Sequence, residues 1–179
     1  LTALSVRNIV LIDQLDLALD EGLTVLTGET GAGKSILLDA LALALGGRGD
    51  ASLVRTGAES GQVVAMLQLP AAHPARQALR DNEIADDEDL ILRRVQYADG
   101  RTRAFVNDQP VSAGLLQTLG RLCVEIHGQH DDRALVDMAT HRALLDAFGV
   151  DFAEIAKLRE AHAALVAAEE ALAEQRAAV

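Results

Sequence analysis

One eight-residue stretch of the sequence has the residue types and spacing of a phosphate-binding loop. It matches the pattern G-x-x-x-x-G-K-[ST] at every position, and its residues are Gly28, Glu29, Thr30, Gly31, Ala32, Gly33, Lys34 and Ser35. In such a loop the glycines let backbone amides converge on phosphate oxygens, and the N-terminus of the following helix adds a positive dipole. Lys34 would reach the β and γ phosphates, and Ser35 would offer its hydroxyl to Mg²⁺. The stretch therefore predicts a site for ATP with Mg²⁺.

A second stretch, His127-Gly128-Gln129-His130-Asp131, also carries side chains suited to chemistry. Two histidines and an aspartate can bind a metal, but this spacing matches no standard zinc site. The histidines can equally be polar loop residues. The interpretation that fits best makes Gln129 a sensor and a catalytic partner of Lys34. An amide at a strand end beside the phosphate loop can coordinate Mg²⁺ and hold the attacking water.

A strand, a loop and a helix must position the phosphate-binding residues. Residues 23–27 predict a strand that leads into the loop, and residues 34–45 predict a helix that is apolar nearly all round and therefore buried. Gly46-Gly47 is a typical helix stop. A strand, a glycine-rich loop and a buried helix in this order are the context that the phosphate-binding pattern requires.

The remainder of the first 126 residues predicts mainly strands. They are expected at about 2–8, 14–19, 62–69, 89–97, 101–106 and 122–126. Asp99-Gly100 predicts a hairpin turn, because both residues tolerate positive φ. Residues 107–110 predict the next turn, and Ser112 can cap a short helix that runs to about Leu119.

Composition and charge restrict the class of protein. The chain has 179 residues, half of them apolar, and it has neither an apolar run long enough for a membrane span nor the features of a signal peptide, so we expect a cytoplasmic protein. Cys123 is the single cysteine; it cannot form an internal disulfide and is expected to be a packed strand thiol. The net charge of -11 repels phosphate backbones unless a local patch overrides it.

Two local clusters of charge stand out. Residues 81–89 are rich in acid and are expected to form a solvated loop, because their spacing fits no calcium-binding loop. Arg93, Arg94, Arg101 and Arg103 cluster on the predicted hairpin, and strand alternation places Arg101 and Arg103 on one face. A solvated hairpin is the simpler interpretation, and DNA contact at Arg101 and Arg103 is a hypothesis.

Residues 151–179 contain neither glycine nor proline and predict a long helix. Apolar or small residues recur along it with heptad spacing, at Leu158, Ala161, Leu165, Ala168 and Leu172; the polar Gln175 and then Val179 continue the spacing. A seam of leucine and alanine suits close antiparallel packing against a partner helix. We therefore expect the beginning of a coiled coil, with an ordinary amphipathic surface helix as the alternative.

In their order, these motifs resemble the N-terminal half of an SMC-type ABC ATPase head. The resemblance rests on LTALSVRNIVLIDQLDLAL, GLTVLTGETGAGKSILLDALALALGGR, FVNDQPVS and EIHGQHD, and it spans nearly the whole chain. It implies an α/β P-loop NTPase fold in which a mixed sheet surrounds the loop helix and antiparallel hairpins are added. Lys34 and Ser35 correspond to the Walker A residues and Gln129 to the Q-loop glutamine. Arg55 would lie near the nucleotide, and Arg7 and Asn8 near its nucleoside.

The resemblance also implies a division of the chain and a set of partners. Residues 1–149 would form the N-terminal lobe of the head, and residues 150–179 would begin the coiled-coil arm. The signature motif, the Walker B aspartate and the catalytic glutamate do not occur after Gln129. They would lie in a C-terminal lobe of the same protein, beyond the coiled coil, so this chain alone should hydrolyse almost no ATP.

The implied activity of the intact protein is ATP hydrolysis in DNA double-strand break repair and recombination. Two heads would sandwich ATP in a homodimer and act on DNA at the nucleoid, without a membrane.

Three alternatives remain open. A small-molecule kinase would need an arginine-rich lid, but Arg48 and Arg55 are sparse; a transporter ATPase would normally place an aromatic ahead of the loop, but none precedes Tyr97. A tether whose assembly is switched by nucleotide would show no significant turnover.

Overall fold

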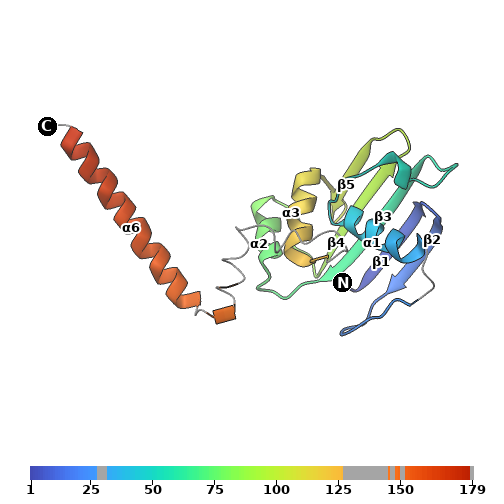
Figure 1. The fold of residues 1–179 in the computed structure, drawn as a ribbon, viewed down its shortest axis with the longest axis horizontal. Coiled ribbons are helices and arrows are strands. Elements are labelled where there is room, and N and C mark those ends of the chain that lie inside the picture. Colours follow the sequence, from blue (N-terminus) through green and yellow to red (C-terminus); the bar gives the residue numbers. More distant parts are fainter. Residues whose placement is uncertain (28–31, 127–144, 146–147, 150–151, 178–179) are drawn as a thin grey trace. The chain divides into compact units, whose positions relative to one another are not determined.

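A six-stranded sheet in the order β2-β1-β3-β4-β5-β6 is the framework of residues 1–126 (Figure 1). The computed structural model describes residues 1–27, 32–126, 145, 148–149 and 152–177. Its strands are β1 (Ala3–Ile9), β2 (Ile12–Ala18), β3 (Ser60–Gln68), β4 (Asp89–Tyr97), β5 (Thr102–Val106) and β6 (Gln109–Val111). All neighbouring strands are antiparallel. Residues 127–179 form a second compact unit.

One face of the sheet carries the core. Side chains on β3 and β4 alternate strictly between buried and half-buried, as expected for strands with one covered face. Helices α1 (Ala32–Ala44) and α3 (Ala113–Cys123) pack on this face (Figure 1). The short helix α2 (Pro74–Asp81) packs beside α3, and a 3₁₀ turn, η1 (Ala51–Leu53), approaches β4.

Helix α1 is buried on one face, which corrects the expectation of burial all round. Ile36, Ala40 and Leu43 recur at helical spacing and are at most 5% exposed, whereas Leu38 on the opposite side is 48% exposed. The predicted stop is confirmed: Gly46 has φ +88°, and the amides of Gly46 and Gly47 donate to carbonyls of the last turn.

Several other local predictions are confirmed. β4 and β5 form the hairpin expected from Asp99-Gly100, and Gly100 has φ +88°. The Ser112 side chain caps α3 by accepting a hydrogen bond from the amide of Leu115 at 3.1 Å. The turn after β5 is shorter than predicted, because only Asn107 and Asp108, both with positive φ, separate β5 from β6.

Two predicted strands are absent, and the sheet of the described residues is antiparallel where a mixed sheet was expected. Residues 23–27 and 124–126 form no strand, and all five strand pairs of the described residues are antiparallel. A strand exists only when a neighbour satisfies its backbone groups, and neither segment has one in the part of the chain that the structure describes. Helix α3 instead continues to Cys123, beyond the predicted end at Leu119.

Cys123 therefore lies at the end of a helix and not in a strand. Its side chain is half-buried, and burial raises the pKa of the thiol. The thiol stays protonated at neutral pH and is a packing group, as the apolar sequence around it predicted.

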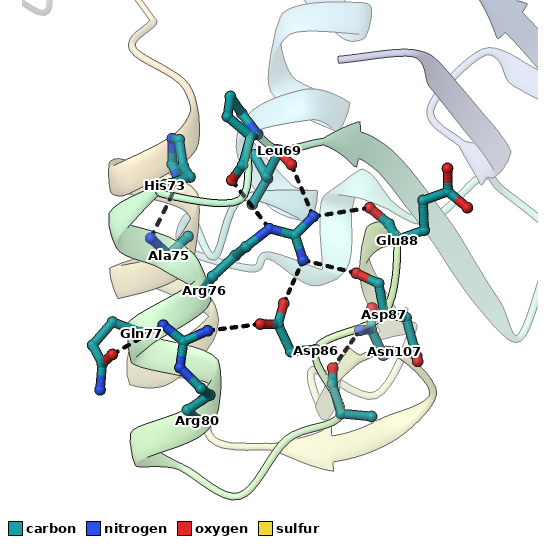
Figure 2. A network of polar contacts seen from close by, with 12 residues as sticks. Leu69, His73, Ala75, Arg76, Gln77, Arg80, Asp86, Asp87, Glu88 and Asn107 are labelled. Atoms are coloured by element: carbon teal, nitrogen blue, oxygen red, sulfur yellow. Dashed lines mark hydrogen bonds and ion pairs between the residues drawn. The ribbon is translucent and has the colours of Figure 1, made fainter.

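The acidic segment that follows α2 is largely exposed, as expected for a solvated loop, and a polar network also holds it in place. Figure 2 shows Arg76 of α2 at the centre of a polar network. Its guanidinium donates to the carboxylate of Asp86 at 2.5 Å and to the backbone carbonyls of Leu69, Pro70, Asp87 and Glu88. Arg80 donates to the other carboxylate oxygen of Asp86 at 2.8 Å. The network ties α2 to the start of β4.

The seam of the second unit lies on helix α6 (Phe152–Ala177), which confirms the long helix predicted there. Its 26 residues span about 39 Å at the rise of an α-helix. Leu158, Leu165 and Leu172, three positions of the predicted seam, are 63%, 56% and 46% exposed. No helix in the part of the chain that the structure describes is both long and apolar enough to cross a membrane.

We predict that Asp86→Ala lowers the free energy of unfolding by about 1–3 kcal/mol, because it leaves the largely buried guanidinium of Arg76 without its carboxylate. Asp87→Ala is the matched control, since Asp87 contributes its backbone carbonyl to Arg76 and not its side chain. The control should stay within about 0.5 kcal/mol of the parent. Urea unfolding followed by circular dichroism measures both, and equal losses would contradict the network's role.

Candidate nucleotide site

The first turn of α1 is the described part of the phosphate-binding loop. Gly28, Glu29, Thr30 and Gly31 lie outside the described residues, and α1 begins at Ala32. A Cβ added at Gly33 would meet no atom within 4 Å, so space for a ligand is open beside this backbone. The first turn contains no acidic residue that would cancel the positive end of the helix dipole.

The buried face of α1 decides how Lys34 and Ser35 are presented. Ile36 and Ala40 anchor the helix on the sheet, and Ser35 is exposed on another side of it. Lys34 is half-buried. An exposed hydroxyl and a lysine in an open helix N-terminus are the chemical groups that a nucleotide phosphate and its Mg²⁺ need. The residues present therefore fit a bound nucleotide.

Asn8 and Arg55 are brought together beside the β1–β2 hairpin. The amide of Arg55 donates to the carbonyl of Asn8 at 3.0 Å, and Asn8 has φ +51°, which marks an irregular end of β1. The Arg55 guanidinium forms an ion pair with Asp13 at 2.8 Å. Asp13 was missed in the sequence, where no spacing rule links it to Arg55. Both side chains are substantially exposed, so the pair contributes little stability and leaves Arg55 accessible.

Arg7 is engaged elsewhere on the hairpin. It forms an ion pair with Asp16 at 2.8 Å, and it donates to the carbonyl of Leu15. The hydrogen bond from Arg7, together with a second from Ser5, lowers the pKa of Asp16 to about 2. Arg7 is thus a structural residue of the β1–β2 pair in this chain.

Gln129, with the rest of 127–131, lies outside the described residues. Its role as a Mg²⁺ ligand and water-positioning residue stays a prediction. Within the described ranges, no three histidine, cysteine, aspartate or glutamate residues gather as a metal site would require. The metal-binding alternative at 127–131 is untested, because those residues lie outside the described ranges.

Apolar side chains are exposed along the segment that leads into the loop. Leu23, Val25 and Leu26 are 92%, 68% and 50% exposed, and Leu38 on the outward side of α1 is 48% exposed. Exposed apolar side chains of this size are less common on a protein surface than polar ones. The strand that sequence reasoning expected at 23–27 has the right composition but no neighbour among the described residues.

The arginine cluster on the β4–β5 hairpin is less basic than the sequence suggested. Arg94 is buried on the core face, which corrects its place in the cluster. Arg93 lies 3.9 Å above the ring of Phe105 and also pairs with Asp108. Arg101 pairs with Asp99, the turn residue of its own hairpin. Arg101 and Arg103 both lie within cation–π distance of Tyr97.

Comparison with known proteins identifies the family. A family model described as AAA domain matches residues 3–108. The chain is 43% identical to the DNA repair protein RecN of Vibrio cholerae over 148 residues, which are 83% of this chain and 27% of that protein. It is 40% identical to RecN of Bacillus subtilis over 149 residues, which are 83% of this chain and 26% of that protein. The chain thus spans about a quarter of the length of the curated relatives it matches.

Solved structures confirm the fold. The Smc head domain of Pyrococcus yayanosii, solved with a coiled coil and joint, superposes with a TM-score of 0.67 at 21% identity and covers 97% of this chain and 36% of that one. A structure described by ATP-driven dimerization and DNA stimulated activation of SMC ATPases gives a TM-score of 0.59 at 19% identity and covers 82% of this chain and 98% of that one. The expected SMC-type head fold is present.

Proposed function

The chain belongs to the AAA domain family, and from this premise we propose that it is the ATP-binding lobe of a RecN-like ATPase that acts in DNA double-strand break repair and recombination. One observation carries the proposal: the sequence GETGAGKS runs into the first turn of α1, which is open and contains no acidic residue. A small-molecule kinase is not favoured, because the relatives at about 40% identity are DNA repair proteins.

Each residue of the site has a proposed role. Backbone amides of residues 28–35 hold the phosphates, Lys34 neutralises charge on the β and γ phosphates, and Ser35 with Gln129 holds Mg²⁺. When bound, Mg²⁺ supplies electrostatic stabilisation of the charge that develops during phosphoryl transfer. Arg55 can exchange its exposed partner Asp13 for a nucleotide phosphate, because the existing ion pair is weak.

The groups that activate water come from a second, C-terminal lobe of the same protein. We place that lobe on the exposed apolar side chains of this chain. They are Leu23, Val25 and Leu26 before the loop and Leu38 on α1. Residues 23–27 then gain the neighbouring strand that the described residues do not provide. The consequence is a division of labour: this lobe binds the nucleotide, and hydrolysis waits for the other.

Residues 150–179 begin the coiled-coil arm in this proposal, and residues 1–149 belong to the head. The exposed leucines of α6 support it, because a helix of this length with an open seam needs a partner helix. Two heads sandwich ATP in a homodimer, by analogy with the ATP-driven dimerisation described for SMC ATPases. A tether that is switched by nucleotide without turnover is the second possibility, and steady-state hydrolysis by the intact protein separates the two.

We predict that Lys34→Ala in the intact protein weakens ATP binding by about tenfold or more, because it removes a charge-assisted contact with the phosphates. Lys157→Ala is the matched control, since Lys157 is the only other lysine and is exposed on α6. Titration with a fluorescent ATP analogue measures both affinities, and steady-state phosphate release measures turnover. Undiminished binding and turnover in Lys34→Ala would remove the proposed site.

We propose DNA contact on the face that carries Arg101 and Arg103. Reversing both charges to glutamate should weaken DNA binding by the intact protein and flatten the dependence of affinity on salt, because fewer phosphates are neutralised. Arg121→Glu, on α3, is the control for a change in net charge. If affinity and salt dependence match those of the control, DNA does not bind at this face.

A further inference from the structure

Arg94 is a buried charge for which the described residues offer no partner. It lies on β4 between Leu92 and Gln96 on the core face, and it is 4% exposed. Its Nε and Nη1 atoms are sealed from solvent and make no hydrogen bond with any residue that the structure describes. Arg76, the other largely buried arginine discussed above, differs from Arg94. Its guanidinium is satisfied by one carboxylate and four carbonyls.

The charge on Arg94 cannot be removed by proton loss. Burial lowers the pKa of its guanidinium, yet arginine keeps its proton in proteins at neutral pH. A buried ion with no counter-ion destabilises the fold. Such an arginine is tolerated when a bound ligand or partner supplies the missing negative charge.

A pocket of about 450 Å³ opens beside this side chain at the β5–β6 end of the sheet. Arg94 lines it together with Thr102, Ala104, Val111 and Ala113. The pocket thus gives a ligand access to the Arg94 side chain, whose Nε and Nη1 have no partner among the described residues. The lining residues include a second arginine, Arg103, and no carboxylate.

The surroundings of the pocket favour a negative group. Ala113 is the first residue of α3, and the first turn of that helix contains no acidic residue, so its positive end is not cancelled. Apart from the two arginines and Thr102, the lining residues are apolar, which suits a single carboxylate flanked by apolar groups better than a highly charged phosphate chain.

The edge of β5 indicates what carries the carboxylate. Strand β6 pairs only with residues 104–106, so β5 has an open edge at Thr102 and Arg103. Tyr97 and Arg101 form a hydrogen-bonded pair between β4 and the β5 end of the hairpin, and antiparallel alternation then turns the backbone groups of Thr102 away from β4. An open strand edge is where an extended peptide adds to a sheet.

We propose that this pocket binds the acidic side chain of an extended polypeptide segment, which lies along the open edge of β5 and pairs its carboxylate with Arg94. The site is separate from the phosphate-binding loop and does not depend on the proposed nucleotide chemistry. It is a recognition site for a peptide with aspartate or glutamate between apolar residues.

The test uses the ¹⁵N-labelled 179-residue chain and two peptides, Ac-Val-Glu-Val-NH₂ and Ac-Val-Gln-Val-NH₂. The Arg94 Nε–H signal is assigned by its loss in Arg94→Met. The glutamate peptide should shift this signal and the Thr102 amide saturably, with an affinity about tenfold above that of the glutamine peptide, because a charge-assisted hydrogen bond is gained. Arg93→Met, which alters the opposite face of β4, should preserve the difference.

Two further readouts keep the proposal falsifiable. Arg94→Met should raise the Tm of the chain, because it removes an unpaired buried charge. A lower Tm would mean that Arg94 already has a partner and would overturn the proposal. Equal affinity for the two peptides, or no shift of the Arg94 signal by either, would also overturn it. Inorganic phosphate, added as a third ligand, would overturn the assignment to a peptide carboxylate if it bound more tightly than the glutamate peptide.

Discussion

An extended backbone needs a neighbouring strand to satisfy its N–H and C=O groups, and this structure depends on that constraint. The six strands of the sheet satisfy one another in a single antiparallel ladder, and the core lies between that ladder and the helices. Residues 23–27 are apolar and extended in character but have no ladder to join among the described residues. They lead directly into the phosphate-binding loop. In the proposed assembly, a second lobe supplies the strand beside residues 23–27.

Helix α1 also has an apolar surface that the described residues leave uncovered. Ile36, Ala40 and Leu43 bury one face on the sheet, and Leu38 leaves an apolar side chain on the opposite face. A helix that is apolar nearly all round is expected to be covered on both sides. The sequence of α1 thus fits a layer of structure beyond this chain, as does the match to about a quarter of the length of RecN relatives.

Features decided by local chemistry could be predicted from the sequence. The Asp99-Gly100 hairpin, the Ser112 cap and the glycine stop after α1 each follow from the residues at that point. Features decided by distant partners could not. The strand at 23–27 was predicted from composition alone, and α2 with its Arg76 network was missed because its contacts come from two segments, one on either side of the helix in the sequence. Alternation along β4 could have placed Arg94 with Leu90 and Leu92 on the core face, but its place among four arginines suggested a surface position.

For the site, GETGAGKS gave Lys34 and Ser35 their proposed roles, whereas Asp13 beside Arg55 carried no signal.

Amide hydrogen exchange of residues 23–27 tests the central claim most directly. We expect fast exchange in the 179-residue chain, and exchange slower by on the order of 100-fold or more in the intact protein, where a second lobe supplies the neighbouring strand. Strong protection of these amides in the 179-residue chain, or equally fast exchange in the intact protein, would contradict the account.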